Sequence, residues 1–314
     1  MAVTAPKNIS DNSTVSPVKG FLRGQISYLL RMLPYQHTWR DKLSTVVEVV
    51  WLLVRYARLG IILRFSTGAE SIRGKTCVAV LLSHNRPQNM SLLVESALRN
   101  RFVTTVIVSN SNPKVKIGDW ITSKDSRLVI INETAPTQPG HRLVLAKQTG
   151  AEYILSIDDD IFLAPMQWKS LFEFLLADER SPHGIVGDLY CPEMEGSNGL
   201  LFNHVTGQDM EVDVLTGVYA FTSEHLKRVF ELAAKIGVSD LSHLRNGEDI
   251  LLSFSGKTRP HIHALKPALL CASGCLPGVA LWKSDDGFWE ERIRVFKNVR
   301  DANLGFVGDA ELGH

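Results

Sequence analysis

Four continuous apolar runs of strand length, alternating with segments of helical spacing, constrain the fold of this chain more than any other feature. The runs read TCVAVLLS, VTTVIVSN, RLVIINE and AEYILSID. They lack the polar alternation of a half-exposed strand, so we expect them to be buried on both faces of a sheet. The segments PQNMSLLVESALRN and HRLVLAKQTG have helical spacing, with Pro87 at a helix start and Gly150 at a helix end. The pattern predicts an α/β fold with a mostly parallel central sheet flanked by helices.

The second half of the chain predicts a smaller mixed region. Its apolar stretches, HGIVGDLYCP, GLLFNHV and MEVDVLTGVYAFT, are short and separated by turn signals, and SEHLKRVFELAAKIG then has helical spacing. No GxGxxG follows the first apolar run, and no GxxxxGK[ST] occurs in the sequence. Both absences argue against a dinucleotide-binding or P-loop domain.

Three consecutive aspartates, Asp158, Asp159 and Asp160, follow the fourth apolar run. Ligands of open α/β sheets bind at the carboxyl ends of the strands, so we expect a site here. One interpretation is a solvated turn in which an aspartate caps a helix that begins near Pro165. Three adjacent carboxylates exceed what one cap needs, and they favour Mg²⁺ or Mn²⁺, which bind carboxylate oxygens together with substrate phosphates. The predicted metal ligands are Asp160 and Asp158, and Asp158 is also suited to accept a hydrogen bond from a ribose hydroxyl.

Polar residues also follow the other predicted strands at the same edge of the sheet. Ser83 and Arg86 come after the first run, Asn110 ends the second, and Arg142 opens the helix before the aspartates. A guanidinium can hold a phosphate or a carboxylate through two hydrogen bonds, and an amide suits the edge of a base. Arg142 is equally compatible with a surface position at a helix start. Because these residues converge on one edge, we predict that they contact a nucleotide.

Glu248 and Asp249 form a second acidic pair, which opens a predicted helix. The two acids could simply favour the positive end of that helix. They could also face a reacting carbon or hydroxyl as a base or an electrostatic stabiliser, and the sequence leaves these interpretations even. Gly217, which follows a short strand, would let the backbone approach a bound substrate closely.

These elements together resemble the exostosin-type glycosyltransferases, family 64, which have the GT-A fold. The resemblance rests on ILSIDDDI, VLTG…F, GEDI…F and SDDGFWEERIRVFKNV, with Arg142 sixteen positions before Asp158. It covers roughly residues 76–300. It implies a metal-dependent, retaining enzyme that moves a sugar, commonly an N-acetylhexosamine or a related hexose, from a UDP-sugar to a glycan or lipid-linked acceptor. It also implies Mn²⁺ or Mg²⁺ as cofactor and an acceptor side in the smaller mixed region.

The resemblance assigns roles to individual residues of this chain. The implied roles are donor and metal binding for Asp158, Asp159 and Asp160, diphosphate or uridine contact for Arg86 and Arg142, base contact for Asn110, and catalysis for Asp249. Two positions depart from the family pattern. Gly247 stands where the family often has a cysteine, and the first loop, LLSHNR, lacks the glutamine and tyrosine that the family often shows there.

Residues 20–75 are unusually basic, with nine Lys or Arg against three Asp or Glu. Their most apolar stretch, TVVEVVWLLVRYARLGIILRF, is interrupted by Glu48, Arg55 and Arg58 before it reaches the length of about 20 residues that a bilayer requires. Composition favours an amphipathic helix packed on its own domain. The excess of arginine also fits an interfacial helix, and we expect residues 40–65 to place the protein on an anionic membrane surface.

The predicted organisation is a disordered tail over residues 1–19, a basic helical segment over 20–75, a glycosyltransferase domain over 76–302 and a tail over 303–314. The net charge of +1 gives no reason to expect a nucleic-acid partner. No N-terminal run resembles a cleavable signal peptide, so we predict a cytoplasmic protein, peripheral on a membrane, rather than a lumenal one. A homodimer and a disulfide between Cys271 and Cys275 stay open.

Two other functions fit parts of the pattern. A nucleotidyltransferase on a similar sheet would also use a metal and acidic residues, but such enzymes usually have a glycine-rich loop after the first strand, which SHNRPQN lacks. A non-catalytic, membrane-docking protein could keep the fold without the reaction. The acceptor cannot be read from the sequence, because fold does not determine function.

Overall fold

The structure, a computed structural model, describes residues 38–65, 70–192, 202–265, 269–270 and 287–301. The predicted tails, at residues 1–19 and 303–314, lie outside the described residues, and so do Cys271 and Cys275. Cys77 and Cys191, the two cysteines within the described part of the chain, are free thiols.

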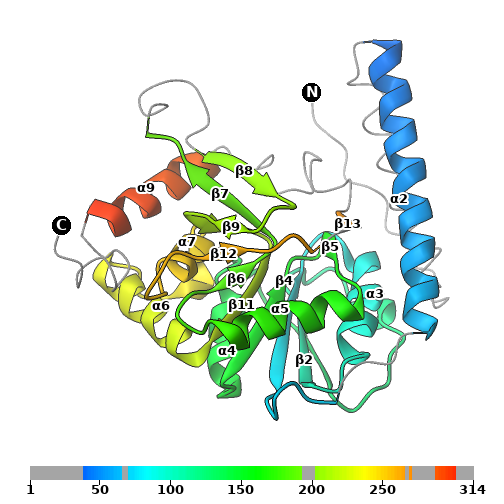
Figure 1. Cartoon of the computed structure of the whole chain (residues 1–314), viewed down its shortest axis with the longest axis horizontal. Helices are drawn as coiled ribbons and strands as arrows, with labels where there is room; N and C mark the ends of the chain where they lie inside the picture. The colour runs from blue at the N-terminus through cyan, green and yellow to red at the C-terminus, as the bar shows by residue number, and fades with distance from the viewer. Residues whose placement is uncertain (1–37, 66–69, 193–201, 266–268, 271–286, 302–314) are drawn as a thin grey trace.

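An eight-stranded sheet forms the centre of the protein (Figure 1). Its strand order is β3–β2–β1–β4–β11–β6–β12–β9, and the first four strands run parallel. These four are the predicted apolar runs: β1 is Cys77–Ser83, β2 Val103–Asn110, β3 Leu128–Asn132 and β4 Tyr153–Ile157. The remaining strands are β11 (Val218–Thr222), which is antiparallel to β4, and the short β6 (His183–Gly184), β12 (His261–Ile262) and β9 (Met210–Glu211). The predicted fold class, an α/β fold around a mostly parallel sheet, is confirmed.

Two small sheets form the predicted mixed region. One has the order β10–β7–β8, with β10 at Val214–Leu215, β7 at Val186–Tyr190 and β8 at Phe202–Thr206. The other pairs β5 (Ile161–Phe162) with β13 (Leu269–Leu270). Because β5 begins directly after the three aspartates, this pairing anchors the turn that carries them.

Helices cover both faces of the large sheet, as predicted (Figure 1). One face packs on α2 (Trp39–Phe65), α3 (Pro87–Leu98) and α5 (Pro165–Ala177). The other packs on α4 (His141–Thr149), α6 (Ser223–Lys235), α7 (Glu248–Ser253) and α9 (Phe288–Asp301). Two 3₁₀ turns, Ile117–Trp120 and Leu241–His243, lie between these elements.

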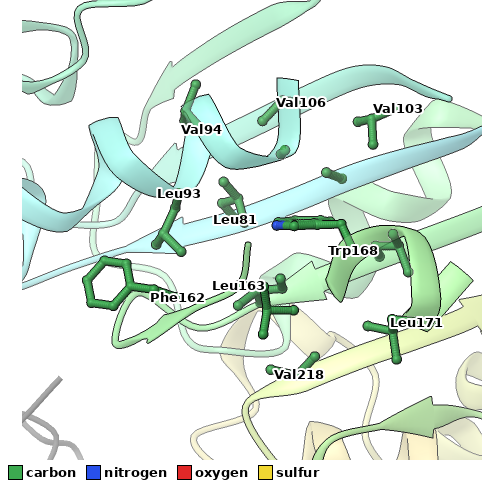
Figure 2. Packing of buried hydrophobic residues seen from close by; sticks show 14 of the residues in the cluster. Leu81, Leu93, Val94, Val103, Val106, Phe162, Leu163, Trp168, Leu171 and Val218 are labelled. Atoms are coloured by element: carbon green, nitrogen blue, oxygen red, sulfur yellow. The ribbon is translucent and has the colours of Figure 1, made fainter. Parts of the chain in front are cut away.

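Strand β1 shows why its sequence is continuously apolar. Ala79 and Leu81 point into the core under α3 and α5, whereas Val78 and Val80 point into the core under α4 and α6. Figure 2 shows the first core, where the buried Trp168 lies among aliphatic side chains from the sheet and from α3. Because β1 is covered on both faces, its carboxyl end is held between the two layers of helices. The polar loop that follows β1 therefore begins at a defined edge of the sheet.

The apolar N-terminal segment forms the 27-residue helix α2 along one flank of the molecule (Figure 1). Tyr56, Leu59 and Leu63 join the core under α3 and α5, and the Tyr56 ring meets the edge of Phe162 in β5, with ring centroids 6.2 Å apart. One face of this segment therefore packs on its own domain. Among the described helices, none combines the length and the apolar character needed to cross a membrane.

Gly140 precedes α4 and allows that helix to approach the 3₁₀ turn at Leu241–His243. A Cβ at this position would overlap the carbonyl oxygen of Leu241. We expect Gly140→Ala to lower the free energy of unfolding by about 1–3 kcal/mol, because the clash is with backbone and α4 must shift. Gly118→Ala is the control, since a Cβ there meets nothing within 4 Å. Chemical denaturation compares the two variants, and equal stability would show that α4 tolerates the shift.

Candidate active site

The three aspartates lie at the carboxyl end of β4, in the middle of the large sheet. The turn is fixed from its backbone, because the Asp158 amide donates to the Gly217 carbonyl at 2.8 Å. Gly217 has a φ of +70°, and a Cβ there would lie 2.5 Å from the Ile161 Cδ1 atom. The positive φ favours glycine at this position, and the β10–β11 turn passes close to Ile161, the residue that follows the aspartates.

Arg142 joins the two halves of the chain at this edge. The side chain is buried, and its Nη2 donates to the Asp158 Oδ1 at 2.5 Å. Its Nε lies 3.9 Å from the Glu248 Oε1, and the guanidinium lies over the Tyr219 ring, 5.1 Å from the centroid. The interpretation of Arg142 as a surface residue at a helix start is therefore wrong. Its hydrogen bond to Asp158 and its ion pair with Glu248 bring a first-half aspartate and a second-half glutamate to one place.

Arg86 fixes the other two aspartates. It forms a short ion pair with Asp159 and a second one, at 3.2 Å, with the Asp160 Oδ2. Asn89, in the first turn of α3, donates to the Asp159 carbonyl at 2.7 Å. These contacts bury Asp159 and leave Asp160 partly exposed. The interpretation of the aspartate run as a solvated turn is therefore wrong for Asp159.

Glu248 and Asp249 begin the six-residue helix α7, and both are buried. The Asp249 oxygens accept from Arg292 Nη1 of α9 at 2.8 and 2.7 Å, and Oδ1 also accepts from the Ile250 amide at 2.8 Å. Arg292 Nη2 donates to Asp188 of β7 at 3.2 Å. An acidic residue can interact favourably with the positive end of a helix while it stays exposed to solvent. The helix-dipole interpretation therefore does not explain why Asp249 is buried and paired with Arg292.

Negative charge exceeds positive charge among the ion pairs of the site. Three described groups of ion pairs together hold six carboxyl groups and three guanidinium groups, with the His204 ring beside Asp188: Asp158, Asp159, Asp160, Asp188, Glu248 and Asp249 against Arg86, Arg142 and Arg292. Burial raises the pKa of Asp160 to about 7, opposed by Arg86 and reinforced by Asp159 and Asp158. Burial likewise raises the pKa of Glu248 to about 7, with Asp249 adding to the effect. A bound cation would relieve this excess.

The aspartate oxygens suit a divalent cation that also binds a substrate. Within the described residues, no three His, Cys, Asp or Glu side chains form a metal cage. Mg²⁺ and Mn²⁺ in substrate-assisted sites need only one or two carboxylates plus phosphate oxygens. In the described structure, Asp158 uses Oδ1 for its ion pair and Asp160 uses Oδ2, so each keeps a second oxygen. The donor set of Asp158 and Asp160 therefore fits such an ion.

The predicted contacts from the first two strands lie beside the aspartates. Ser83 is paired in register with Asn110, and its buried hydroxyl has no hydrogen-bond partner within the described residues. Because this hydroxyl is closed off from solvent, its contact with a nucleotide stays a prediction. The Asn110 amide instead donates to the Asn112 and Val115 carbonyls, at 2.9 and 2.6 Å, within its own loop. Base contact by Asn110 stays a prediction, and these bonds show that the amide also shapes the loop.

Sequence analysis missed four residues that organise the site. Arg292 and Asp188 orient Asp249, Asn89 fixes the aspartate turn, and the Tyr219 hydroxyl accepts a hydrogen bond from the Gly217 amide at 2.8 Å. Arg292 lies within the SDDGFWEER motif, so it could have been singled out there. Tyr219 lies within the VLTG…F motif, whereas Asp188 and Asn89 carry no motif, and only the fold brings these two to the site.

No protein-family profile and no curated protein matches the chain, so membership of family 64 stays a prediction. Solved structures do match. One is GalNAc-T7 with UDP, GalNAc and Mn²⁺, at 10% identity and a TM-score of 0.47, over 76% of this chain and 53% of that one. Another is S. aureus TarS with UDP, at 13% identity and a TM-score of 0.39, over 62% of this chain and 59% of that one.

A third similar structure is CMP:2-keto-3-deoxy-manno-octonic acid synthetase with CTP, at 12% identity and a TM-score of 0.34, over 50% of this chain and 78% of that one. The chain spans about half the length of the GalNAc-T7 chain. At these low TM-scores the similarity does not decide a function, and the residues at the sheet edge must carry that argument.

Proposed function

We propose that the chain is a glycosyltransferase that moves a sugar from a UDP-sugar to an acceptor hydroxyl at the carboxyl edge of β4. The observation that carries this proposal is the link made by Arg142 between Asp158 and Glu248. It places carboxyl groups suited to a metal–diphosphate next to a second acidic pair suited to the reacting centre. The UDP-sugar class, and retention of configuration at the anomeric carbon, come from the sequence resemblance.

Asp158 and Asp160 are the residues that would hold Mn²⁺ or Mg²⁺. When bound, the ion supplies neutralisation of the diphosphate leaving group. Arg86 positions Asp160, and Arg142 positions Asp158, so the free oxygens of both carboxylates keep a fixed place. The Ser83 hydroxyl, which has no partner within the described residues, is buried and would contact the nucleoside of the donor only after a neighbouring side chain moves.

Asp249 and Glu248 take different parts in the proposed reaction. Both Asp249 oxygens are occupied by Arg292, so this carboxylate suits electrostatic stabilisation of positive charge at the anomeric carbon rather than nucleophilic attack. Glu248 has a pKa raised to about 7 by burial, which suits a group that accepts the proton of the acceptor hydroxyl. The bond from sugar to UDP breaks, the bond from sugar to acceptor oxygen forms, and UDP leaves.

Incubation with radiolabelled UDP-sugars and GDP-sugars, with Mn²⁺ and lipid and glycan acceptors, tests the proposal. We expect transfer or slow hydrolysis of one UDP-sugar, with release of UDP. Release of pyrophosphate from a nucleoside triphosphate and a sugar phosphate would instead identify a nucleotidyltransferase. Heat of UDP binding in calorimetry without any product would identify a non-catalytic protein.

Asp160→Asn should abolish most Mn²⁺-dependent activity and weaken Mn²⁺-dependent UDP binding about tenfold or more, because one hard oxygen ligand becomes an amide. EDTA should have the same effect on the unaltered protein, reversed by Mn²⁺. Asp119→Asn is the control, since Asp119 is exposed in the 3₁₀ turn at Ile117–Trp120. Calorimetry with UDP measures binding. Equal UDP affinity of Asp160→Asn and Asp119→Asn in Mn²⁺ would remove Asp160 from the metal site.

A further inference from the structure

Helix α2 carries most of the exposed large apolar side chains of the described structure. Nine of the twelve exposed large apolar side chains that the structure describes lie on this one helix, and the other three are on β3 and α5. Trp39 is 69% exposed and Trp51 59% exposed. Soluble proteins rarely gather apolar side chains in this way unless a partner covers them.

The helix has two apolar faces on opposite sides. With about 100° per residue, the buried side chains Val49, Tyr56, Leu59 and Leu63 fall on one side. The nine exposed apolar side chains span about 160° on the other side, and five of them fall within about 60° of one another: Trp39, Leu43, Val50, Val54 and Ile61. We call these five residues the outer stripe. Packing on the domain accounts for the first face and leaves the outer stripe in solvent.

Positive charge lies beside the outer stripe. Arg40, Lys42 and Arg58 are the exposed charged side chains among those that the structure describes on α2. By the same helical geometry, Arg40 and Arg58 lie on one side of the stripe together with Trp51, and Lys42 lies on the other. In a symmetric pair with a second copy, these cations would approach one another, which costs free energy. An anionic lipid surface satisfies them, and indole rings suit the headgroup layer.

We propose that the outer stripe of α2 docks on an anionic lipid bilayer, with the helix lying in the headgroup layer. The stripe enters the apolar boundary while Arg40, Lys42 and Arg58 contact lipid phosphates. The inner face of the helix stays on the domain, where Tyr56 packs against Phe162, two residues after Asp160. Docking would therefore hold the catalytic edge at a fixed place relative to the bilayer. The proposal concerns binding and is independent of the proposed reaction.

Sedimentation with lipid vesicles tests the proposal on the full chain. We expect strong binding to vesicles of equal parts phosphatidylcholine and phosphatidylglycerol, and at least tenfold weaker binding to phosphatidylcholine alone. Binding should fall in about 1 M salt, where the Debye length shrinks to about 3 Å. A protein that stays in the supernatant with anionic vesicles at low salt would overturn the proposal.

Two pairs of variants test the outer stripe and the basic residues beside it. Val50→Asp/Val54→Asp should reduce binding at least tenfold, whereas Met166→Asp, at an exposed apolar residue of α5, should not. Arg40→Glu/Arg58→Glu should also reduce binding at least tenfold. Its control, Lys227→Glu/Lys235→Glu, makes the same change in net charge at exposed residues of α6 and should bind as before.

Two further measurements separate docking from other causes. The thermal unfolding midpoint of the α2 variants should match that of the unaltered chain, which shows that the domain is folded whether or not it binds UDP. Sedimentation velocity without lipid should show the same species for all variants. A dimer that Val50→Asp/Val54→Asp dissociates, together with no vesicle binding, would assign the outer stripe to a second copy of the chain and overturn the lipid proposal.

Discussion

Asp249→Asn should lower turnover by about two orders of magnitude or more, with UDP affinity changed only a few-fold. The buried group of Asp188, Arg292 and Asp249 carries two carboxylates and one guanidinium, so its formal charge is negative. The substitution removes one negative charge while Arg292 stays cationic.

Asp188→Asn is the matched control. It removes the same charge from the same arginine, but Asp188 lies on β7 and also contacts His204 at 2.9 Å. Both variants should lose comparable thermal stability, because each removes a partner from a buried ion pair. Asp249→Asn should lose far more turnover than Asp188→Asn, because Asp249 begins α7 next to Glu248, whereas Asp188 lies on β7, on the other side of Arg292. Equal losses of turnover in the two variants would show that the ion pair supports α7 and α9 rather than the reaction.

Arg86 and Asp159 show the limit of sequence-based inference at this site. The apolar runs predict buried strands, because a continuous apolar run of strand length between turn residues is typical of a strand covered on both faces. The carboxyl ends of these strands define the edge of the sheet where the site is expected. The sequence predicts both residues at that edge. The sequence does not reveal that they neutralise each other, because they are 73 positions apart and the pairing depends on how α3 meets β4. Arg86 is thus bound to two aspartates rather than directed only at a nucleotide.

Helix α2 shows the same limit at the surface. Its composition predicts an apolar helix and leaves its location open between domain and membrane. The structure divides the apolar residues into two faces, so packing on the domain and an exposed apolar stripe both hold. Periodicity alone does not distinguish packing on the domain from docking on a membrane. A helix with apolar residues on two sides has the same sequence pattern as a helix that is buried all round. Contacts across the fold decide which side is covered.

Arg142→Met should destabilise the protein by about 3 kcal/mol and also weaken UDP binding. The arginine is buried, so removing it leaves the Asp158 and Glu248 carboxyl groups without their shared partner. Thermal or chemical denaturation measures the first effect and calorimetry the second. Arg142→Lys is the comparison, because lysine keeps the charge but lacks the planar group that now reaches Pro139, Ser156 and Asp158. Lysine should restore part of the stability and little of the binding.

A double-mutant cycle with Asp158→Asn shows how Arg142 acts on the donor. The sequence resemblance implies direct contact with the diphosphate or uridine, yet Nη2 already donates to Asp158 at 2.5 Å and Nε to the Pro139 carbonyl at 3.2 Å. If Arg142 works by positioning Asp158, the double variant should bind UDP about as well as Arg142→Met alone. Additive losses of binding free energy would instead mean that the guanidinium turns from Asp158 to the donor. In that case the ion pair of the ligand-free protein must open when UDP binds.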